Sequence, residues 1–521
     1  MELDSKKVCI ISFLISIIIF VSMLAYMWHF TVDDAFISFN YSKHLVNGLG
    51  LVWNIGQSPV EGYTNFLWVL MIAFGLLFKL DPVFLTKILG LSSVFGILII
   101  FWFITKDMFK DKNKQLIAFV VSSIFFLVNP YTAIHAVSGL ETMFYAFLLL
   151  GAVYSAWKII LSFNLKFIWI FAFTSLLLSL TRPEGTLISL GLILTIIYIS
   201  YKNNNSIKLN QFIPILILYL TPITIYMVFS ISYFHELFPL SFISKVTHGN
   251  TYPGYFLLAL IYLIPFVFMI LFSLYTKNQR IEKHENQQKA CFKYFLLILG
   301  VAIFFADIAY VNTPDINFGQ RYFYPSFVLV YMAFGIAFTM LFNEIRNISS
   351  KTENALKIFA SAVILALLVF SCFNSMSDFN FNYDYGINLN NAHIPLGKSL
   401  DTFAADDYTV YCGDAGSIAY YSGWNLLDAL NDKYIAQNGV TLGYLKQMHP
   451  ELVIIISSYK TINWDSQSPA VKDYILKNNF TQLDSIKFNN NYYLIPFLKP
   501  NIKDYESIKN SIETVSKGSN K

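Results

Sequence analysis

Long apolar stretches recur along the chain, separated by short polar segments. A hydrocarbon layer about 30 Å thick needs roughly 20 apolar residues in a helix to cross it. The first such run, 8–29, follows Lys6 and Lys7 and has no small-residue cleavage site after it, so it is predicted to be a retained anchor that starts in the cytoplasm. Later runs of spanning length lie near 82–105, 115–131, 140–160, 167–181, 184–202, 210–231, 254–276, 293–311, 323–343 and 356–373. The pattern predicts about eleven transmembrane helices.

Whether the apolar segment 66–80 crosses the membrane determines the side of the membrane on which every later loop lies. If it crossed the membrane, the lysine-rich loops at 106–114 and 277–293 would fall outside, against the excess of Lys and Arg that cytoplasmic loops carry. At about 15 residues it is also short for a span. We therefore interpret it as an interfacial or re-entrant helix at the outer surface, with those loops in the cytoplasm.

The pattern changes near residue 375, where charges return and apolar runs shorten to strand length. Short β-branched or aromatic runs predict strands at 408–412, 452–456 and 492–497. Helical spacing predicts helices at 432–448 and 468–478. The sequence thus predicts a polytopic α-helical membrane domain, 1–374, followed by a small α/β domain, 375–521, outside the cytoplasm.

Composition supports lipid as the main solvent of the chain. Charged residues make up 13% of the 521 residues, apolar residues 56% and aromatic residues 17%, and the mean hydropathy is +0.54. A net charge of +4 argues against nucleic acid as a partner, because proteins that bind phosphate backbones carry concentrated basic patches. The four cysteines are far apart in sequence, which predicts neither a disulfide framework nor a zinc site.

Polar clusters concentrate on the predicted outer side. Asp33 and Asp34 directly follow the first span, where two acids can deprotonate a hydroxyl or hold a divalent ion, or can simply cap the next helix. The aromatic residues of the following loop suit either a headgroup belt or a platform for sugar rings. The remaining outer-side ionisable candidates are Glu61, Glu141, Arg182, Glu184, Lys245 and Arg321. A cation there can bind the phosphate of a lipid substrate, or its side chain can simply extend to the headgroups of the bilayer. Arg182 and Glu184 could also neutralise one another.

Several stretches together carry a family resemblance. They are DDAFISFNYSKHLVNGLGLVWN, VEGYTNFLW, SGLET, TRPEG, PLSFISK, HIPLGKSL and GDAGSIAYYSGWNLLDALNDKYIA. In this order they resemble a bacterial family of GT-C membrane glycosyltransferases, of which the mycobacterial terminal arabinofuranosyltransferase is the best-known type. The resemblance implies a GT-C-like fold in the cytoplasmic membrane of a bacterium. It also implies transfer of a sugar from a polyprenyl-phosphate donor to an envelope glycan or glycolipid on the outer face.

The resemblance also implies roles for particular residues. The general base of GT-C enzymes is an acid in the first outer loop, which by position is Asp33, with Asp34 beside it. Lys245 matches the end of a PNTxxxK-like segment whose Asn-Thr pair is replaced here, and Arg321 matches by its place before a late span. Both would bind the donor phosphate. The other four outer residues would orient loops or bind sugar hydroxyls: Glu61, Glu141, Arg182 and Glu184.

The chemistry of such a transfer suits these residue types. An acceptor hydroxyl needs a base as it attacks the anomeric carbon, and a leaving phosphate needs cationic stabilisation more than a proton. No cofactor is required, although the paired acids leave a divalent cation possible. Gly413 and Asp414 follow a predicted strand but lack a dinucleotide-binding pattern, so this turn is assigned either to packing on the membrane domain or to acceptor glycan.

Two other functions compete with this one. A transporter or flippase of lipid-linked sugars would show inverted repeats and ionisable residues at the bilayer midplane. The sequence has no evident repeat, and its clear intramembrane acid, Asp307, is predicted near an outer helix end. An oligosaccharide ligase with a different lipid-linked donor would share most of the features above.

The charge argument makes a direct prediction of topology. A reporter fused after Lys112 should report the cytoplasm, and reporters fused after Gly50 or Lys521 should report the outside, because only this arrangement keeps the lysine-rich loops inside. Compartment-specific reporter activity measures this. The orientation would have to be rejected if Lys112 and Gly50 reported the same side.

Overall fold

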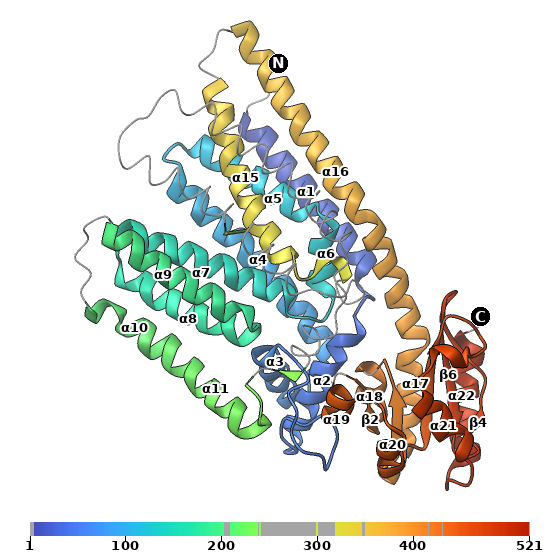
Figure 1. The fold of residues 1–521 in the computed structure, drawn as a ribbon. Helices are drawn as coiled ribbons and strands as arrows, with labels where there is room; N and C mark the ends of the chain where they lie inside the picture. The colour runs from blue at the N-terminus through green and yellow to red at the C-terminus, as the bar shows by residue number, and fades with distance from the viewer. Residues whose placement is uncertain are drawn as a thin grey trace.

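The computed structural model describes most of the predicted membrane domain and nearly all of the C-terminal part. The described residues are 5–202, 209–237, 239–240, 299–300, 318–345 and 350–519, apart from residues 415 and 430. The predicted span at 254–276 and nearly all of that at 293–311 lie outside them. Figure 1 shows a helical bundle whose lower end meets a domain of sheet and short helices.

Four helices among the described residues are long and apolar enough to cross a membrane. They are 6–27 within α1 (Ser5–Met27), α4 (Pro82–Met108), α7 (Thr142–Ser162) and the helical stretch 213–234, which ends in α11 (Thr221–Phe234). Shorter apolar segments lie in α8 (Leu165–Thr181), α9 (Glu184–Lys202) and α15 (Tyr324–Ile345). These helices match predicted runs, but the count of eleven spans is not confirmed.

The predicted span at 115–131 is broken. Helix α5 (Lys112–Leu127) is followed by α6 (Pro130–Val137), and the two axes differ by 66°. The Asn129 side chain accepts the Tyr131 backbone N–H, and Pro130 occupies the first turn of α6. Both features start a new helix rather than extend the old one.

Helix α3 (Phe66–Leu77) covers most of the segment whose role fixes the orientation. Its 12 residues extend about 18 Å, well short of the roughly 30 Å hydrocarbon layer. It packs against α2 (Asp33–Val46), and the Ser42 hydroxyl donates to the Val69 carbonyl at 2.9 Å. This length agrees with an interfacial or re-entrant helix.

One long helix joins the two halves of the molecule. Helix α16 runs without a break from Ser350 to Asn391, 42 residues, along one side of the bundle and into the C-terminal domain (Figure 1). The predicted boundary at residue 375 therefore lies inside a continuous helix. The separate elements of the tail begin with α17 (His393–Leu400).

The C-terminal domain is a sheet with helices on both faces. Its strands are β1 (Thr409–Cys412), β2 (Asn425–Leu427), β3 (Leu452–Ser457), β4 (Thr481–Gln482), β5 (Ile486–Asn489) and β6 (Tyr492–Leu498). Their order is β2-β1-β3-β6-β4, with β5 also paired to β6, and the β2–β1–β3 part is parallel. The strands predicted at 408–412, 452–456 and 492–497 correspond to β1, β3 and β6.

The sheet separates two apolar cores because side chains alternate along each strand. Leu452 and Ile454 of β3 face a core shared with α17, α18 (Gly416–Ser422) and α22 (Tyr505–Ser519). Val453 and Ile455 face the other core, which is covered by α19 (Lys433–Asn438), α20 (Leu442–Met448) and α21 (Pro469–Lys477). The single helix predicted at 432–448 is two helices, because the chain turns at Gly439 with a φ of +70°.

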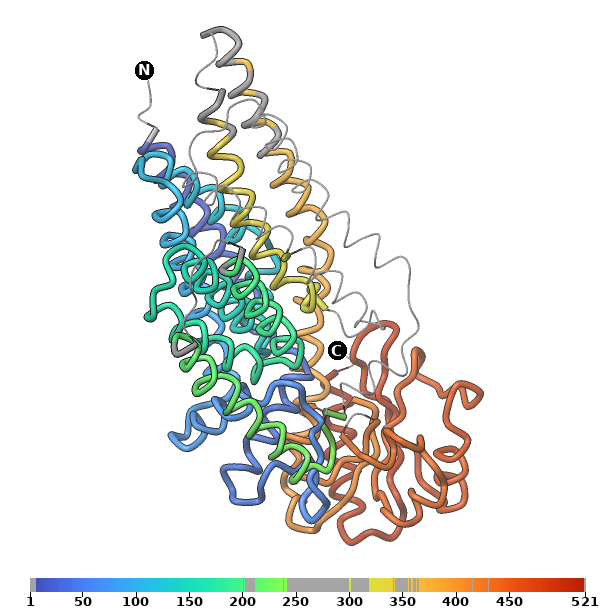
Figure 2. The backbone as a smooth tube through the Cα atoms, turned by 60° about the vertical axis from the view of Figure 1, so that its left-hand side comes forward, coloured from blue at the N-terminus to red at the C-terminus, as the bar shows by residue number. Residues whose placement is uncertain are grey.

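The C-terminal domain is tied to the loop that follows α2. The Trp53 indole and the Asn54 amide both donate to the Leu426 carbonyl, at 2.9 and 3.0 Å, and Asn54 Oδ1 accepts the Leu426 N–H at 2.8 Å. Lys43 donates to the Tyr420 carbonyl at 3.1 Å. Figure 2 shows this loop in blue beside the orange and red C-terminal domain. Segments nearly 400 residues apart thus meet at one end of the bundle.

Candidate active site

The two adjacent acids at the start of α2 have different partners. Asp33 turns toward the C-terminal domain, where its carboxylate accepts the backbone N–H of Gly416 at 2.9 Å and that of Ser417 at 2.8 Å. The Ser417 hydroxyl donates to the same carboxylate at 2.5 Å. Asp33 therefore caps a helix, as one alternative reading of the sequence proposed, but that helix is α18 and not its own.

The contact is too close for any side chain at residue 416. A Cβ atom added to Gly416 would lie 2.0 Å from the Asp33 carbonyl oxygen and 2.8 Å from its carboxylate. Glycine is the residue that allows two backbones to approach this closely. The GDAG turn of the sequence thus serves to pack the C-terminal domain onto α2.

A group of ionisable side chains surrounds this contact. His393 Nε2 is 2.9 Å from a carboxylate oxygen of Asp414, which also accepts a hydrogen bond from the Tyr492 hydroxyl. Burial and the nearby Asp414 charge raise the pKa of Asp33, although His393 and Ser417 oppose the change. Burial alone would lower the pKa of His393, but Asp414 and Asp33 outweigh it and raise that pKa. The cluster favours a protonated His393 between two carboxylates.

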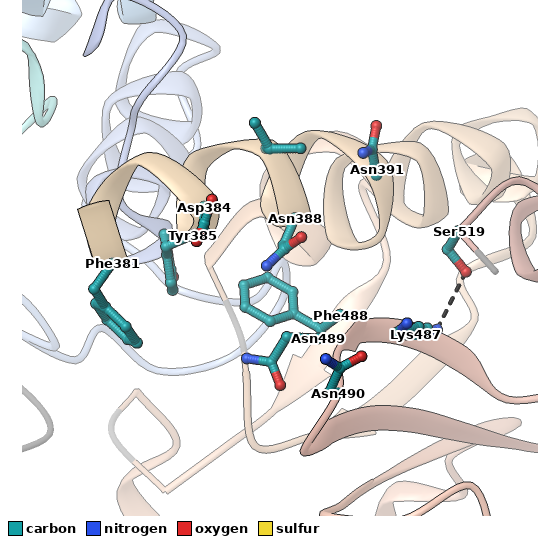
Figure 3. Close-up of a pocket in the computed structure, with 11 residues that line it drawn as sticks. Phe381, Asp384, Tyr385, Asn388, Asn391, Lys487, Phe488, Asn489, Asn490 and Ser519 are labelled. Atoms are coloured by element: carbon teal, nitrogen blue, oxygen red, sulfur yellow. Dashed lines mark hydrogen bonds between the residues drawn. The ribbon is translucent and has the colours of Figure 1, made fainter. Parts of the chain in front are cut away.

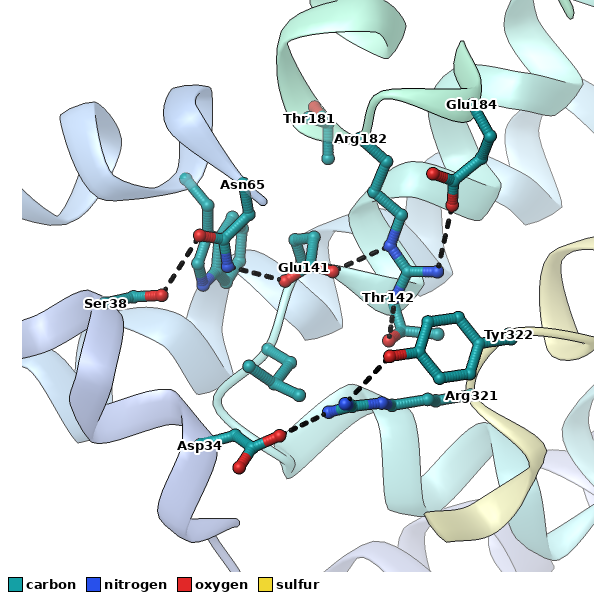
Figure 4. A network of polar contacts seen from close by, with 12 residues as sticks. Asp34, Ser38, Asn65, Glu141, Thr142, Thr181, Arg182, Glu184, Arg321 and Tyr322 are labelled. Atoms are coloured by element: carbon teal, nitrogen blue, oxygen red, sulfur yellow. Dashed lines mark hydrogen bonds and ion pairs between the residues drawn. The ribbon is translucent and has the colours of Figure 1, made fainter. Parts of the chain in front are cut away.

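Asp34 points away from the C-terminal domain toward the membrane bundle. Its Oδ2 lies 3.0 Å from Nη1 of Arg321, and its side chain is 42% exposed whereas that of Arg321 is 5% exposed (Figure 4). The carboxylate of Asp34 is thus accessible on one side and held by a buried cation on the other.

Arg321 is presented by an unusual piece of backbone before α15. Residues 319 and 320 both have positive φ angles, 54° and 56°, within the short turn Phe318–Gln320. The guanidinium lies 5.0 Å from the Phe318 ring centre and 4.9 Å from that of Tyr322, and it donates to the Tyr322 hydroxyl at 3.0 Å. Its buried Nε–H has no hydrogen-bond acceptor in the structure described here.

A second buried arginine lies on the other side of Tyr322. Arg182 Nε donates to Glu141 Oε1 at 2.7 Å and its Nη2 donates to the Thr142 hydroxyl at 3.0 Å. Its guanidinium is 5.4 Å from the Tyr322 ring centre. Its Nη1, 3.6 Å from Glu184 Oε1, is buried without a hydrogen-bond acceptor among the described residues. Two guanidiniums therefore flank one tyrosine, and each has a buried N–H group without a hydrogen-bond acceptor in the described part of the chain.

Three sequence motifs meet in this network. Asn65, from VEGYTNFLW, donates to Glu141 Oε2 at 2.8 Å, and Glu141 belongs to SGLET. Arg182 belongs to TRPEG, whose glycine lies so close to the preceding helix that an added Cβ would be 2.4 Å from the Leu178 carbonyl oxygen. Burial would raise the pKa of Glu141, but Arg182 and Asn65 outweigh it and hold that pKa below its usual value. The motifs thus build a buried, ionised Glu141–Arg182 pair.

The predicted site residues fall into separate groups. The structure brings together Asp34, Glu141, Arg182, Glu184 and Arg321 (Figure 4). Asp33 lies next to this group in sequence but binds α18. Glu61 lies elsewhere, where it accepts hydrogen bonds from Tyr226 at 2.7 Å and Ser230 at 3.3 Å on α11. Lys245 lies outside the described residues.

Some residues of the site were not singled out from the sequence. Tyr322 carries no sequence signal of its own, and Asn65 is present only as one residue of the VEGYTNFLW motif. His393 begins the quoted HIPLGKSL stretch, but its pairing with Asp414 has no local signal. Among the described residues no three His, Cys, Asp or Glu side chains converge as metal ligands would, so the divalent cation stays an expectation.

Comparisons with known proteins bear on the fold. A family described as a domain of unknown function, DUF8728, matches residues 383–506. No curated protein matches. Two solved structures of ArnT from Cupriavidus metallidurans do match, one bound to undecaprenyl phosphate and one in the apo state. The first has a TM-score of 0.60 and 9% sequence identity, and the alignment covers 94% of this chain and 97% of ArnT. The second has a TM-score of 0.56 and 9% sequence identity, and the alignment covers 97% of this chain and 98% of ArnT.

The chain therefore has an ArnT-like GT-C fold. Both alignments cover nearly the whole of each chain, so the likeness includes the helical bundle and the C-terminal sheet domain together. It confirms the predicted GT-C-like fold of apolar helices followed by a C-terminal sheet domain. The finer likeness to the arabinofuranosyltransferases stays a resemblance in sequence motifs.

Glu61 makes the stability of the protein depend on pH. Burial raises its pKa from 4.5 to about 7, against the hydrogen bonds from Tyr226 and Ser230. Between about pH 4.5 and 7, Glu61 therefore stays protonated in the folded protein but is ionised in the unfolded chain. The free energy of unfolding should fall as the pH rises through this range, by about 3 kcal/mol at most. Thermal unfolding of the detergent-solubilised protein at several pH values measures this.

A Glu61→Gln variant should lose this slope because its amide does not titrate. Glu506, an exposed carboxylate on α22, supplies the matched control, and Glu506→Gln should keep the wild-type slope. Identical pH profiles for wild type and Glu61→Gln would show that the Glu61 pKa is not raised.

Proposed function

We propose that this protein is a membrane glycosyltransferase that moves a sugar from a polyprenyl-phosphate donor to an envelope glycan or glycolipid on the outer face of the cytoplasmic membrane. The observation that carries the proposal is the half-exposed Asp34 paired with Arg321, beside a second buried guanidinium. In support, the fold is that of ArnT, and one ArnT structure was solved with undecaprenyl phosphate bound.

Asp34 suits the role of general base better than Asp33. A base must have a lone pair free for the hydroxyl whose proton it takes. The carboxylate of Asp33 accepts three hydrogen bonds from Gly416 and Ser417. That of Asp34 has one partner among the described residues, Arg321, and an exposed side. We therefore assign the base to Asp34 and give Asp33 the role of holding the C-terminal domain.

Arg321 and Arg182 suit the donor phosphate. Each has a buried N–H without an acceptor among the described residues, and an unmet buried donor is costly until a ligand supplies an oxygen. Guanidinium groups bind phosphate oxygens in a planar, forked geometry. Lys245 would add a third cation. Glu141 and Glu184 hold Arg182 in place and offset part of its charge.

The two halves of the site are linked through Arg321. In the free protein the Arg321 guanidinium holds Oδ2 of Asp34 at 3.0 Å, so one oxygen of the carboxylate is already occupied. A donor phosphate that draws the guanidinium away would leave Asp34 free to take a proton. Donor binding would thus activate the base only when the sugar is present.

The bonds exchanged are then as follows. The acceptor oxygen attacks the anomeric carbon as its proton passes to Asp34. The bond between that carbon and the phosphate oxygen breaks, and its electron pair leaves with polyprenyl phosphate, whose charge Arg321 and Arg182 stabilise. Attack opposite to the leaving group inverts the anomeric centre. No metal or cofactor enters these steps, although a divalent cation near the acids would be compatible with them.

The decisive test compares the two adjacent acids. Asp34→Asn should lower sugar transfer by about 10²- to 10⁴-fold because the amide cannot take the proton. Donor binding should persist because Arg321 and Arg182 remain. Asp33→Asn should lower transfer less but should expose the C-terminal domain to protease, since it weakens the contact with α18. Release of polyprenyl phosphate from a panel of polyprenyl-phosphate sugars, with limited proteolysis alongside, measures both effects.

The opposite ranking would return the base to Asp33. It would require Asp34→Asn to transfer at near the wild-type rate, while Asp33→Asn is inactive with its C-terminal domain still protected. A lipid-linked sugar transporter, the competing function, would release no polyprenyl phosphate in either variant or in the wild type.

Replacement of the donor cation tests the phosphate assignment. Arg321→Lys keeps a positive charge but loses the forked donor geometry, so the KM for the donor should rise about tenfold with a smaller change in the KM for the acceptor. Lys503→Ala, which removes a cation that is 75% exposed on the C-terminal domain, should change neither constant. Equal donor KM values for wild type and Arg321→Lys would remove Arg321 from the donor site.

A further inference from the structure

A pocket lies between the end of α16 and the hairpin formed by β5 and β6. Its volume is about 450 Å³, within the range of sites for small organic ligands. Figure 3 shows the helix on one side and the hairpin on the other, with polar and aromatic side chains between them. The residues that characterise it are Phe381, Asp384, Asn388, Lys487, Asn489 and Asn490. None of them belongs to the network around Asp34.

Several asparagine side chains line the pocket. The side chains of Asn388 and Asn490 make no hydrogen bonds within the part of the chain described here, and Asn388 faces the hairpin (Figure 3). Asn489 Oδ1 accepts the Asn491 N–H at 2.8 Å, and its amide N–H₂ has no acceptor among the described residues. An amide both donates and accepts, so it matches neighbouring hydroxyl groups, each of which does the same.

Aromatic side chains supply the apolar part of the lining. Phe381 is 61% exposed at one end of the pocket. Phe488 forms part of the wall and packs edge-on against Tyr385, with ring centres 5.3 Å apart. A sugar ring presents C–H groups on its faces and hydroxyls at its edge, so it needs this combination of aromatic faces and amides.

The charge of the lining argues against other ligands. Asp384 and Lys487 give one negative and one positive side chain and no net charge. A phosphorylated or otherwise anionic ligand would be expected to meet several cations, as we propose for Arg182 and Arg321. A lipid tail would leave the amides unpaired at considerable cost. The lining therefore selects a neutral, hydroxyl-rich ligand.

One residue, Tyr385, connects the pocket to the candidate active site. Tyr385 lines it, and the hydroxyl of the same residue accepts the Asp33 backbone N–H at 3.3 Å. Asp33 is followed directly by Asp34. A ligand bound against Tyr385 would therefore lie near Asp33 and its neighbour Asp34, so that an acceptor chain held there could extend to the reacting hydroxyl.

We propose that this pocket binds the glycan chain of the acceptor, as a neutral oligosaccharide held by Asn388, Asn489, Asn490 and the ring of Phe381. This proposal rests on the proposed glycosyltransferase function, because it assigns the acceptor side of that reaction to the junction of α16 and the C-terminal domain. Binding here would hold the acceptor while its terminal hydroxyl reaches Asp34.

The test separates binding from transfer. Full-length protein carrying Asp34→Asn, purified in detergent, is applied to an array of neutral oligosaccharides, acidic oligosaccharides and peptides. At least one neutral oligosaccharide should be retained. The affinity for it should fall roughly three- to tenfold in each of two further variants, Asn388→Ala and Phe381→Ala, because each removes one contact. Asn510→Ala, at an exposed asparagine on α22 outside the pocket, should bind as the parent does.

Each outcome decides the matter. Retention of only acidic oligosaccharides or only peptides would overturn the proposal, as would oligosaccharide binding that is unchanged in both pocket variants. In the transferase assay, with Asp34 intact, Asn388→Ala should raise the KM for the acceptor and leave that for the donor unchanged. Asp34→Asn could still transfer sugar while Asn388→Ala weakened oligosaccharide binding. That result would reject the proposed mechanism and still support the glycan-binding site.

Discussion

The contact between the Asp33 carboxylate and the first turn of α18 fixes the geometry of the rest of the site. A carboxylate withdrawn from water needs several hydrogen bonds, each worth about 1.5 to 3 kcal/mol when one partner is charged. Gly416 and Ser417 supply three. Because successive residues of a helix point about 100° apart, a fixed Asp33 turns Asp34 toward the bundle, where Arg321 meets it. One acid thus joins the domains, and its neighbour is left for the proposed chemistry.

The buried arginines form the second constraint. A buried cation without a partner is unstable, so Arg182 depends on Glu141 and Arg321 depends on Asp34. These pairings differ in burial: the Glu141–Arg182 pair is almost fully enclosed, whereas Asp34 is 42% exposed. An enclosed pair resists rearrangement, and a pair with one exposed member can exchange partners when a ligand arrives. This difference makes Arg182 a fixed element of the proposed phosphate site and Arg321 the element that responds to the donor.

The sequence alone located helices and strands wherever the pattern of a short segment determines its structure. Apolar runs located most described helices, and alternating β-branched residues located β1, β3 and β6. Local signals failed where a distant segment decides the outcome. Asp33 and Asp34 are equivalent by pattern, and only Gly416, nearly 400 residues later, separates their roles. Arg182 could be paired with nearby Glu184 by sequence, but its shortest ion pair is with Glu141. We predicted the end of the membrane domain at residue 375, where charged residues return. Helix α16 nevertheless continues to Asn391, because a helix can extend beyond the bilayer when its residues become polar.

The continuity of α16 has a consequence for the proposed reaction. Its C-terminal part contributes Tyr385 to the contact with Asp33 and Asn388 to the amide-rich pocket, so both are built on one rigid element. A helix transmits a displacement along its axis with little loss, whereas a flexible linker does not. If the acceptor glycan binds beside α16, its position is fixed relative to Asp33 and therefore relative to Asp34. The C-terminal domain then contributes to transfer by completing the geometry of the acceptor side, which a flexibly tethered binding module could not do.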